Sequence, residues 1–247
     1  MDALIMCGGH GTRLRGRRND SSDNETRPPD EVLNIEINDN SADHGDGLRP
    51  DNSVTNRSSA VSDQSIIDCE KPLIEINGTA MLSHVASALT ASPVETVWAV
   101  TSPNAPRTAT AVREASRFES IASIETPGDG YVSDLQHALS MLDTPVVTTP
   151  ADLPLISSDH IAKVINTARL NDDNDPTSTM LCVPAALKKQ LGVSVDTVFE
   201  HDHLQVAPSG INIVAGDTDT VQLSYDARLA INVNRPTDKR VAEKLCE

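Results

Sequence analysis

The sequence predicts an α/β fold built on a single doubly wound, mainly parallel sheet. Three observations predict it. Short apolar segments alternate along the chain with longer segments whose apolar residues recur at helical spacing. Gly, Pro, Asn and Asp interrupt the chain between most of these segments, as expected for connecting loops. Several of the loops carry polar residues, and sheets of this kind bind ligands at the carboxyl ends of their strands.

The elements follow one another in a regular order. The apolar run Ala3–Cys7 predicts the first strand, and a Gly-Gly pair ends it. Much later, Ile74–Ile76 leads into an Asn77-Gly78 turn, and Met81–Leu89 has the apolar spacing of a helix. Further strands are predicted at residues 96–100, 120–125, 145–148, 180–183, 210–214 and 227–233. Further helices are predicted at residues 107–118, 132–142, 158–169 and 237–245. The rest of 190–225 gives no clear pattern.

Residues 17–68 differ in composition from the rest of the chain. They contain almost no apolar clusters and are dense in Asn, Asp, Ser, Gly and Pro. Such a segment buries too little surface to offset the entropy lost on ordering it. We interpret it as a disordered acidic and polar insertion in a single domain that spans residues 1–247. Without it roughly 200 residues remain, enough for one α/β core.

The charge balance narrows the range of partners. The 36 acidic and 20 basic side chains give a formal net charge of −16, and aromatic residues make up 2% of the chain. The regular elements after residue 71 argue against general disorder. The composition instead favours a halophilic, haloarchaeal protein, because concentrated salt screens an acidic surface and shortens the Debye length to about 3 Å. Without a basic stripe, nucleic acid is not an expected partner.

Cysteine use and hydropathy predict a cytoplasmic protein. The four cysteines are scattered, with no CxxC pair, and form neither a zinc pattern nor a disulfide framework. The chain opens directly on a predicted strand rather than on a signal peptide. No apolar run reaches the roughly 20 residues that a membrane span needs.

The loop after the first strand has the composition of an anion-binding loop. Gly8, Gly9 and Gly11 let the backbone approach a ligand and direct N–H groups at it, and Thr12 and Arg13 follow. The Arg13 guanidinium suits phosphate oxygens. The loop lacks the Gly-Lys-Ser/Thr ending of a Walker A motif and the third glycine of a dinucleotide fingerprint. A tight turn without a ligand is the alternative for this loop taken alone.

Three further loops converge with it at the same edge of the predicted sheet, at residues 101–104, 128–130 and 151–152. Asp152 follows an apolar strand and is flanked by two prolines, which suits a Mg²⁺ ligand, the alternative being a helix cap or surface turn. Asn232 and Asn234 alternate along a predicted strand, so both point to one face, and one of them is a candidate second metal ligand. A turn at the strand end is the alternative. Lys71 precedes a proline and could reach a triphosphate beside Arg13.

The sequence indicates neither a histidine metal site nor a hydrolase site. The triplet His201-Asp202-His203 has no further ligands in register and is interpreted as a solvated turn rather than a metal site. The sequence shows no arrangement typical of a hydrolase triad.

Several of these segments together resemble one enzyme family. MDALIMCGGHGTRL, EKPLIEINGTAML, TSPNAPRT, GDGYVSDL, SGINIV and the proline-flanked Asp152 are similar to archaeal adenosylcobinamide-phosphate guanylyltransferases. That family belongs to a group with molybdenum-cofactor guanylyltransferases and sugar-phosphate nucleotidyltransferases. The resemblance covers nearly all of the chain except the insertion. It implies a Rossmann-like fold of the nucleotide-diphospho-sugar transferase type.

The resemblance also implies a reaction and a set of roles. GMP would pass from GTP to adenosylcobinamide phosphate, giving adenosylcobinamide-GDP and pyrophosphate in cobalamin biosynthesis. The glycine loop, Arg13 and Lys71 would hold the triphosphate, and Mg²⁺ on Asp152 would bridge protein and nucleotide. By analogy, the remaining nucleotide contacts would come from Asn104, Gly128, Gly130 and Asp134. The large corrin acceptor would lie near Gly210, Ile211 and Asn212. The chain departs from the family pattern in one place, because the insertion separates Arg13 from Lys71.

Two other functions stay open at this point. One is a nucleotidyltransferase that uses another acceptor, such as the molybdenum cofactor or a sugar phosphate. The other is a nucleotide-binding regulator without activity. The sequence leaves open whether the protein forms a homodimer.

Overall fold

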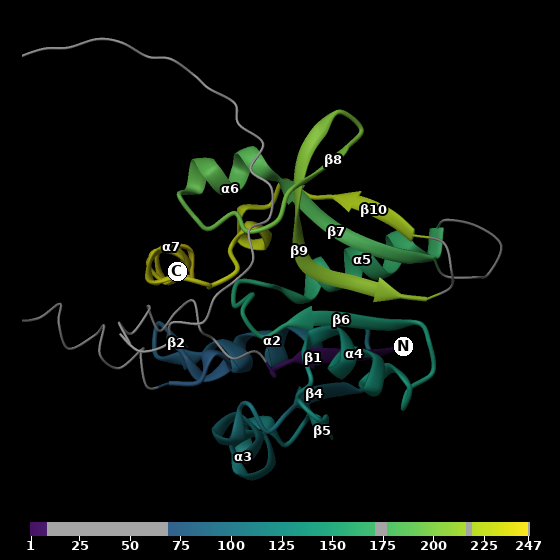
Figure 1. The fold of residues 1–247 in the computed structure, drawn as a ribbon, viewed down its shortest axis with the longest axis vertical. Coiled ribbons are helices and arrows are strands. Elements are labelled where there is room, and N and C mark those ends of the chain that lie inside the picture. The colour runs from purple at the N-terminus through teal and green to yellow at the C-terminus, as the bar shows by residue number, and fades with distance from the viewer. Residues whose placement is uncertain (9–68, 171–176, 216–218, 247) are drawn as a thin grey trace, which may run out of the picture.

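The computed structural model describes residues 1–8, 69–170, 177–215 and 219–246. Their main feature is an eight-stranded sheet in the order β10-β7-β9-β6-β1-β4-β5, with β8 paired to β9 (Figure 1). The strands are β1 (Asp2–Met6), β4 (Val97–Thr101), β5 (Ala122–Glu125), β6 (Val146–Pro150), β7 (Ser178–Pro184), β8 (Phe199–His201), β9 (Leu204–Val214) and β10 (Asp219–Leu223). A separate two-stranded sheet, β2 (Glu75–Ile76) and β3 (Thr79–Ala80), is joined by the predicted Asn77-Gly78 turn.

One strand near the middle of the large sheet, β9, runs opposite to the strands on both sides of it. β6, β1, β4 and β5 are parallel to one another. β9 is antiparallel to both β6 and β7, and β10 is parallel to β7. The carboxyl ends of the parallel strands therefore lie beside the middle of β9 rather than beside another loop. The predicted α/β fold with a mainly parallel sheet is confirmed.

Helices cover both faces of the sheet. They are α2 (Met81–Thr90), α3 (Pro106–Glu114), α4 (Tyr131–Leu139), α5 (Ser158–Leu170), α6 (Ala185–Leu191) and α7 (Pro236–Leu245). The described residues also form three 3-10 turns: η1 (Lys71–Leu73), η2 (Ser116–Phe118) and η3 (Ala227–Ala230). In the described part of the chain, no helix combines the length and the apolar character needed to cross a membrane.

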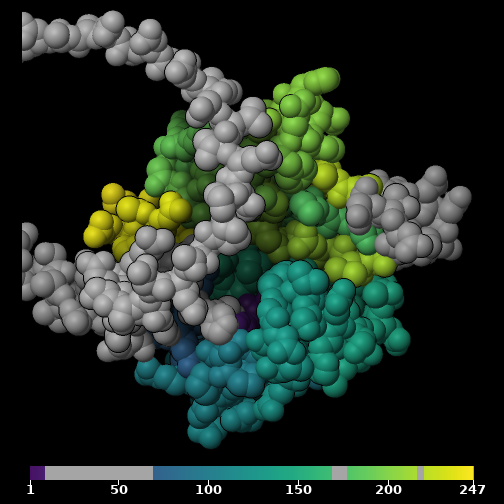
Figure 2. Space-filling view, viewed as in Figure 1, coloured from purple at the N-terminus to yellow at the C-terminus, as the bar shows by residue number. Residues whose placement is uncertain are grey.

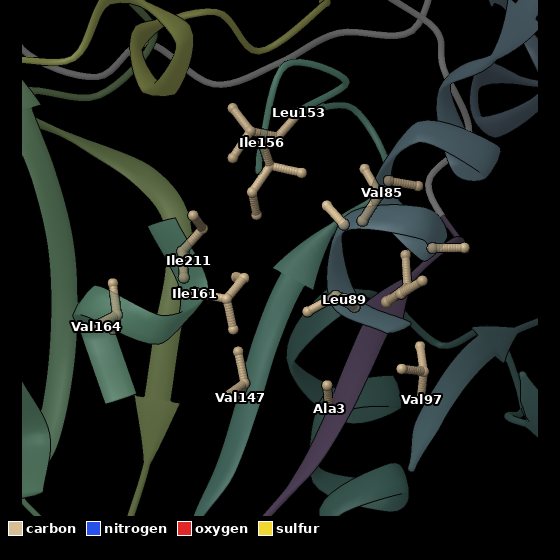
Figure 3. Packing of buried hydrophobic residues seen from close by; sticks show 14 of the residues in the cluster. Ala3, Val85, Leu89, Val97, Val147, Leu153, Ile156, Ile161, Val164 and Ile211 are labelled. Carbon is tan, nitrogen blue, oxygen red and sulfur yellow. The ribbon is translucent and has the colours of Figure 1, made fainter. Parts of the chain in front are cut away.

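Alternation along the strands divides the core between the two faces. Ala3 and Ile5 of β1 point to the face covered by α2, α3 and α5, whereas Leu4 and Met6 point to the face covered by α4. Figure 3 shows the first of these clusters, in which Leu89 of α2 and Ile161 of α5 lie over the sheet. The doubly wound arrangement follows directly from these two apolar faces.

The structure corrects several predicted elements. Residues 227–233 do not form a strand: η3 covers 227–230, and the residues after it are extended without strand pairing. The helix predicted at 107–118 ends at Glu114 and is followed by η2. Helix α6 and strands β8 and β10 were not predicted. No disulfide joins the four cysteines, all of which lie within the described residues.

Candidate active site

A cavity of about 260 Å³ lies where β1, β4 and β6 end. We call it the first cavity. Figure 2 shows a hollow between the blue to teal part of the molecule and the green part, with the purple of the N-terminal strand visible inside it. The lining residues are Met6, Cys7, Gly8, Lys71, Pro72, Val100, Asn104, Gly130, Tyr131, Asp134, Pro150, Ala151 and Asp152. Six positions predicted from the sequence to bind substrate or metal therefore share one cavity.

Gly8 is the residue of the predicted phosphate loop that lies within the described part of the chain. Gly8 lines the first cavity, and a Cβ atom at this position would lie 3.0 Å from Ser102 Oγ, so the backbone here has little room for a side chain. Gly9, Gly11, Thr12 and Arg13 lie outside the described residues. Burial raises the pKa of the neighbouring Cys7 thiol to about 12, which excludes it as a thiolate nucleophile near neutral pH.

Lys71 and Asp152 form an ion pair inside the first cavity. Lys71 Nζ lies 2.5 Å from Asp152 Oδ2 and donates a second hydrogen bond, 2.6 Å long, to Asn234 Oδ1. The backbone carbonyl of Asp152 accepts a hydrogen bond from the amide of Val233, which ties the loop after β6 to the segment before α7. The lysine and the carboxylate that the sequence singled out thus meet at the end of β6.

Asn232, the other predicted asparagine, contacts the Asp152 carboxylate directly. Asn232 donates from Nδ2 to Asp152 Oδ1 at 3.1 Å and to the Ser209 carbonyl at 2.9 Å. Its own Oδ1 accepts a hydrogen bond from Lys188 Nζ. The alternation argument was wrong, because no strand runs through these residues. Both amide oxygens that the sequence offered as metal ligands accept hydrogen bonds from lysines in this structure.

The loops predicted to flank the base form one hydrogen-bonded unit. Asn104 Nδ2 donates to the Gly128 carbonyl at 2.8 Å, and the Gly128 amide donates to Asp134 Oδ1 at 2.9 Å. Gly128 has a φ of +85°, and a Cβ there would lie 2.8 Å from Asn104 Nδ2, so glycine is required on two counts. Asp134 is only 4% exposed and still lines the first cavity, as does Gly130.

The residues predicted to bind the acceptor are separated by the structure. Gly210 lines a second cavity, described below. Ile211 has no exposed surface, packs in the core and lines neither cavity. Asn212 lines neither of the two cavities at this edge of the sheet, and its amide bonds to Thr148 Oγ1 and the Gly210 carbonyl. Successive side chains of a strand point to opposite faces, so Ile211 points away from the face on which Gly210 and Asn212 lie.

The second cavity, of about 240 Å³, adjoins the first. Its lining residues are Tyr131, Pro150, Asp152, Lys188, Ser194, Asp196, Thr197, Ala207, Pro208, Gly210, Asn232 and Asn234. Tyr131, Pro150 and Asp152 line both cavities. The ion pair therefore lies where the two meet. The sequence interpretation missed Lys188 because helix α6 was not predicted.

The chemistry of the Asp152 site fits a cation shared with a phosphate ligand. A carboxylate offers about four lone-pair positions, of which the hydrogen bonds from Lys71 and Asn232 use two. Among the described residues, no group of three or more His, Cys, Asp or Glu side chains could enclose a metal. Mg²⁺ is usually bound through one or two carboxylates together with substrate phosphates and water. Asp152 can supply that single carboxylate.

Comparison with known proteins identifies the family. Residues 66–199, more than half of the chain, match the MobA-like NTP transferase domain. The chain belongs to this family. The match begins after β1 and the glycine loop, near the end of the segment that separates Arg13 from Lys71. The protein is accordingly an enzyme of the nucleotidyltransferase class.

The chain is also similar to one protein in sequence and to two solved structures. The chain is 27% identical over 179 residues to an adenosylcobinamide-phosphate guanylyltransferase of Methanocaldococcus jannaschii, covering 71% of this chain and 88% of that protein. The structure of a 4-diphosphocytidyl-2C-methyl-D-erythritol synthase matches with a TM-score of 0.54 at 13% identity, over 72% of this chain and 94% of the other. A CMP:2-keto-3-deoxy-manno-octonic acid synthetase matches at 16% identity with a TM-score of 0.44, over 72% and 77%. The match to the 4-diphosphocytidyl-2C-methyl-D-erythritol synthase supports the fold alone.

Proposed function

We propose that this nucleotidyltransferase transfers GMP from GTP to adenosylcobinamide phosphate, releasing pyrophosphate. The observation that carries the choice of substrates is the 27% identity to the Methanocaldococcus jannaschii adenosylcobinamide-phosphate guanylyltransferase over 88% of that protein. The two cavities that meet at Asp152 support a reaction between two bound substrates. The motif segments quoted above support the same substrates.

The proposed step needs positioning more than proton transfer. An oxygen of the acceptor phosphate forms a bond to the α-phosphorus of GTP. The bond from that phosphorus to the oxygen bridging to the β-phosphorus breaks, and pyrophosphate leaves with the electron pair. A phosphate nucleophile is already ionised near neutral pH, so the protein need supply no general base. Its tasks are to align the two anions and to neutralise charge.

Each part of the first cavity has a proposed task. The Lys71 ammonium binds the triphosphate, together with Arg13 and the loop residues Gly8, Gly9, Gly11 and Thr12. Asp152 holds Mg²⁺, which when bound supplies positive charge beside the triphosphate. Asn234 and Asn232 keep Lys71 and Asp152 in place through the hydrogen bonds described above.

We assign recognition of the guanine edge to the hydrogen-bonded unit formed by Asn104, Gly128 and Asp134. Guanine presents two neighbouring N–H donors, on N1 and N2, which suit a carboxylate acceptor. Asp134 Oδ1 already accepts from the Gly128 amide, and the same carboxylate faces the first cavity. The Asn104 amide nitrogen donates to the Gly128 carbonyl, which leaves the Asn104 amide oxygen as an acceptor for the base. Gly130, at the start of α4, closes this side of the cavity.

The decisive experiment measures pyrophosphate release in molar KCl with Mg²⁺, GTP and adenosylcobinamide phosphate, omitting each component in turn. Release that requires all of them and fails with ATP is the expected result. High salt is chosen because of the net charge of −16. Release that depends on molybdopterin or a sugar phosphate instead would reassign the acceptor. GTP binding without release with any of the three acceptors would indicate a regulator and overturn the proposal.

A further inference from the structure

The second cavity contains a buried ammonium group that nucleotide binding does not use. Lys188 lies on α6 and is only 4% exposed, yet it lines this cavity. Its Nζ donates to the Ala230 carbonyl at 2.8 Å and to Asn232 Oδ1 at 3.1 Å. An ammonium has three protons, and the described residues accept two of them.

The ammonium of Lys188 has carboxylates near it, but among the described residues none contacts it directly. The two carboxylates that line the cavity each have a cation of their own: Asp152 contacts Lys71, and Asp196 contacts Arg235 Nη2 at 3.3 Å. Within the described part of the chain, no carboxylate forms a salt bridge with Lys188. Burial lowers the pKa of Lys188, while Asp152, Asp238 and Asp196 act from a distance in the opposite direction. Buried lysines usually have a paired anion, because an isolated buried charge is costly.

We propose that the second cavity binds the phosphate monoester of the acceptor and that Lys188 is its cationic ligand. This inference rests on the proposed function, because it places the attacking phosphate. A phosphate on Lys188 would accept the third proton of the ammonium, give it a direct anionic contact, and lie on the acceptor side of Asp152. The Thr197 hydroxyl, which also lines the cavity, adds a second donor. The cavity's volume of about 240 Å³ accommodates a phosphate and the first atoms of its ester, and the corrin ring remains outside.

A purely structural role for Lys188 makes a different prediction. Lys188 also holds Asn232, which in turn donates to Asp152. If that were its whole function, removing the ammonium would disturb Asp152 and impair use of both substrates or the turnover number alone. A phosphate ligand would instead show itself in the affinity for the acceptor, with the affinity for GTP retained.

The test compares Lys188→Met with Lys189→Met, its exposed neighbour on the same helix, in the full chain. Initial rates are measured against each substrate, with the other saturating. We expect Lys188→Met to raise the acceptor KM roughly 10- to 100-fold, the size of one lost hydrogen bond to a charged group, and to change the GTP KM less than about twofold. Lys189→Met should match the wild type. Lys188→Arg, which keeps the charge, should recover part of the acceptor affinity. If Lys188→Met fails to fold, Lys188→Gln replaces it, since a neutral donor preserves the internal bonds but not the charge.

A second measurement separates this inference from the proposed function. Inorganic phosphate is titrated calorimetrically into the GTP-saturated protein without any acceptor. We expect binding to the wild type and the Lys189 variant and at least about tenfold weaker binding to the Lys188 variant. If phosphate binds in this way but adenosylcobinamide phosphate is not turned over, the proposed acceptor is wrong and the phosphate site at Lys188 still stands. An acceptor KM within twofold of wild type, or equal phosphate binding by all three proteins, would overturn the assignment of Lys188.

Discussion

Asp238 offers the sharpest test of how the wall of the second cavity is stabilised. Its side chain is fully buried near the start of α7 and has no cation in contact among the described residues. Oδ1 accepts from the Ser194 amide at 2.8 Å. Oδ2 accepts from Ser194 Oγ at 2.8 Å, the Asn234 amide at 3.0 Å and the Arg235 amide at 2.8 Å. One carboxylate thus joins α7 to two segments that line the second cavity.

The cost of Asp238→Asn can be worked from these four bonds. The new NH₂ group must replace one oxygen, and the less harmful choice is Oδ1, where it opposes a single donor, the Ser194 amide. A buried donor left unsatisfied costs about 1–3 kcal/mol. The other three bonds lose their ionic character, and charge-assisted bonds are roughly twice as strong as neutral ones, which adds about 0.5–1 kcal/mol each. The expected loss of unfolding free energy is about 3–5 kcal/mol.

Thermal and urea unfolding of the full chain measure this loss, with Asp143→Asn as the control because Asp143 is exposed. For a domain of this size, the loss corresponds to a fall in Tm of roughly 10 °C, whereas the control should change stability by less than about 0.5 kcal/mol. A loss below about 1 kcal/mol for Asp238→Asn would refute the reasoning. It would mean that the four donors find other acceptors and that the carboxylate does not organise the cavity wall.

Four further predictions concern Asp152 in the first cavity, the start of α3, the pH range of stability and residues 18–68. Asp152→Asn should lower turnover at least about 100-fold with the fold intact, the scale of losing one preorganised charged group, and steady-state pyrophosphate assays at saturating substrates check it. Glu70→Gln should lower the free energy of unfolding by about 1–3 kcal/mol, because the buried Glu70 carboxylate accepts three hydrogen bonds at the start of α3. Urea unfolding measures this loss, and an unchanged free energy of unfolding would show that α3 does not need this cap. The Arg228 guanidinium holds the pKa of the Asp226 carboxyl well below its usual range, so the ionised carboxylate stabilises the fold above about pH 4 and this contribution is lost as the pH falls further. The Tm of Asp226→Asn should therefore fall less than that of the wild type between about pH 5 and 3. An equal fall of Tm in the two proteins would contradict this. Replacing residues 18–68 by a short linker should leave GTP affinity unchanged in calorimetric titration, because so polar a segment has little surface to contribute to a core, and loss of binding by a folded product would show that it takes part.

Much of the fold could be predicted because buried strands carry their signal locally. The apolar run Ala3–Cys7 gave β1 to within a residue, and the helix predicted at 158–169 is Ser158–Leu170. The failure at 227–233 has the same origin. Leu229, Ala230, Ile231 and Val233 are buried as an apolar strand would be, but packing rather than strand pairing buries them. An apolar pattern indicates burial, and the sequence contains nothing that separates the two ways of achieving it.

The candidate site was predictable only where its residues follow strands. Gly8, Asn104 and Asp152 each come after an apolar strand, so convergence at one sheet edge follows from parallel topology. Lys188 and Asp238 carry no such signal. Each acts through partners some 40 positions away in the chain, and these contacts depend on how β7, β9 and α7 are placed rather than on local pattern.

The reversal of strand direction between β6 and β9 explains why two cavities meet at one carboxylate. Up to β6, parallel strands deliver their loops to a single edge, and these loops form the first cavity. β9 runs the other way, so it brings the middle of a strand to that edge instead of a loop. There Gly210 lies against Pro150, where a Cβ atom would come within 2.7 Å of the proline ring. This close approach lets the segments around β9 form a second cavity directly beside Asp152. A parallel strand in place of β9 would instead bring one more loop to this edge, in the position that the second cavity now occupies.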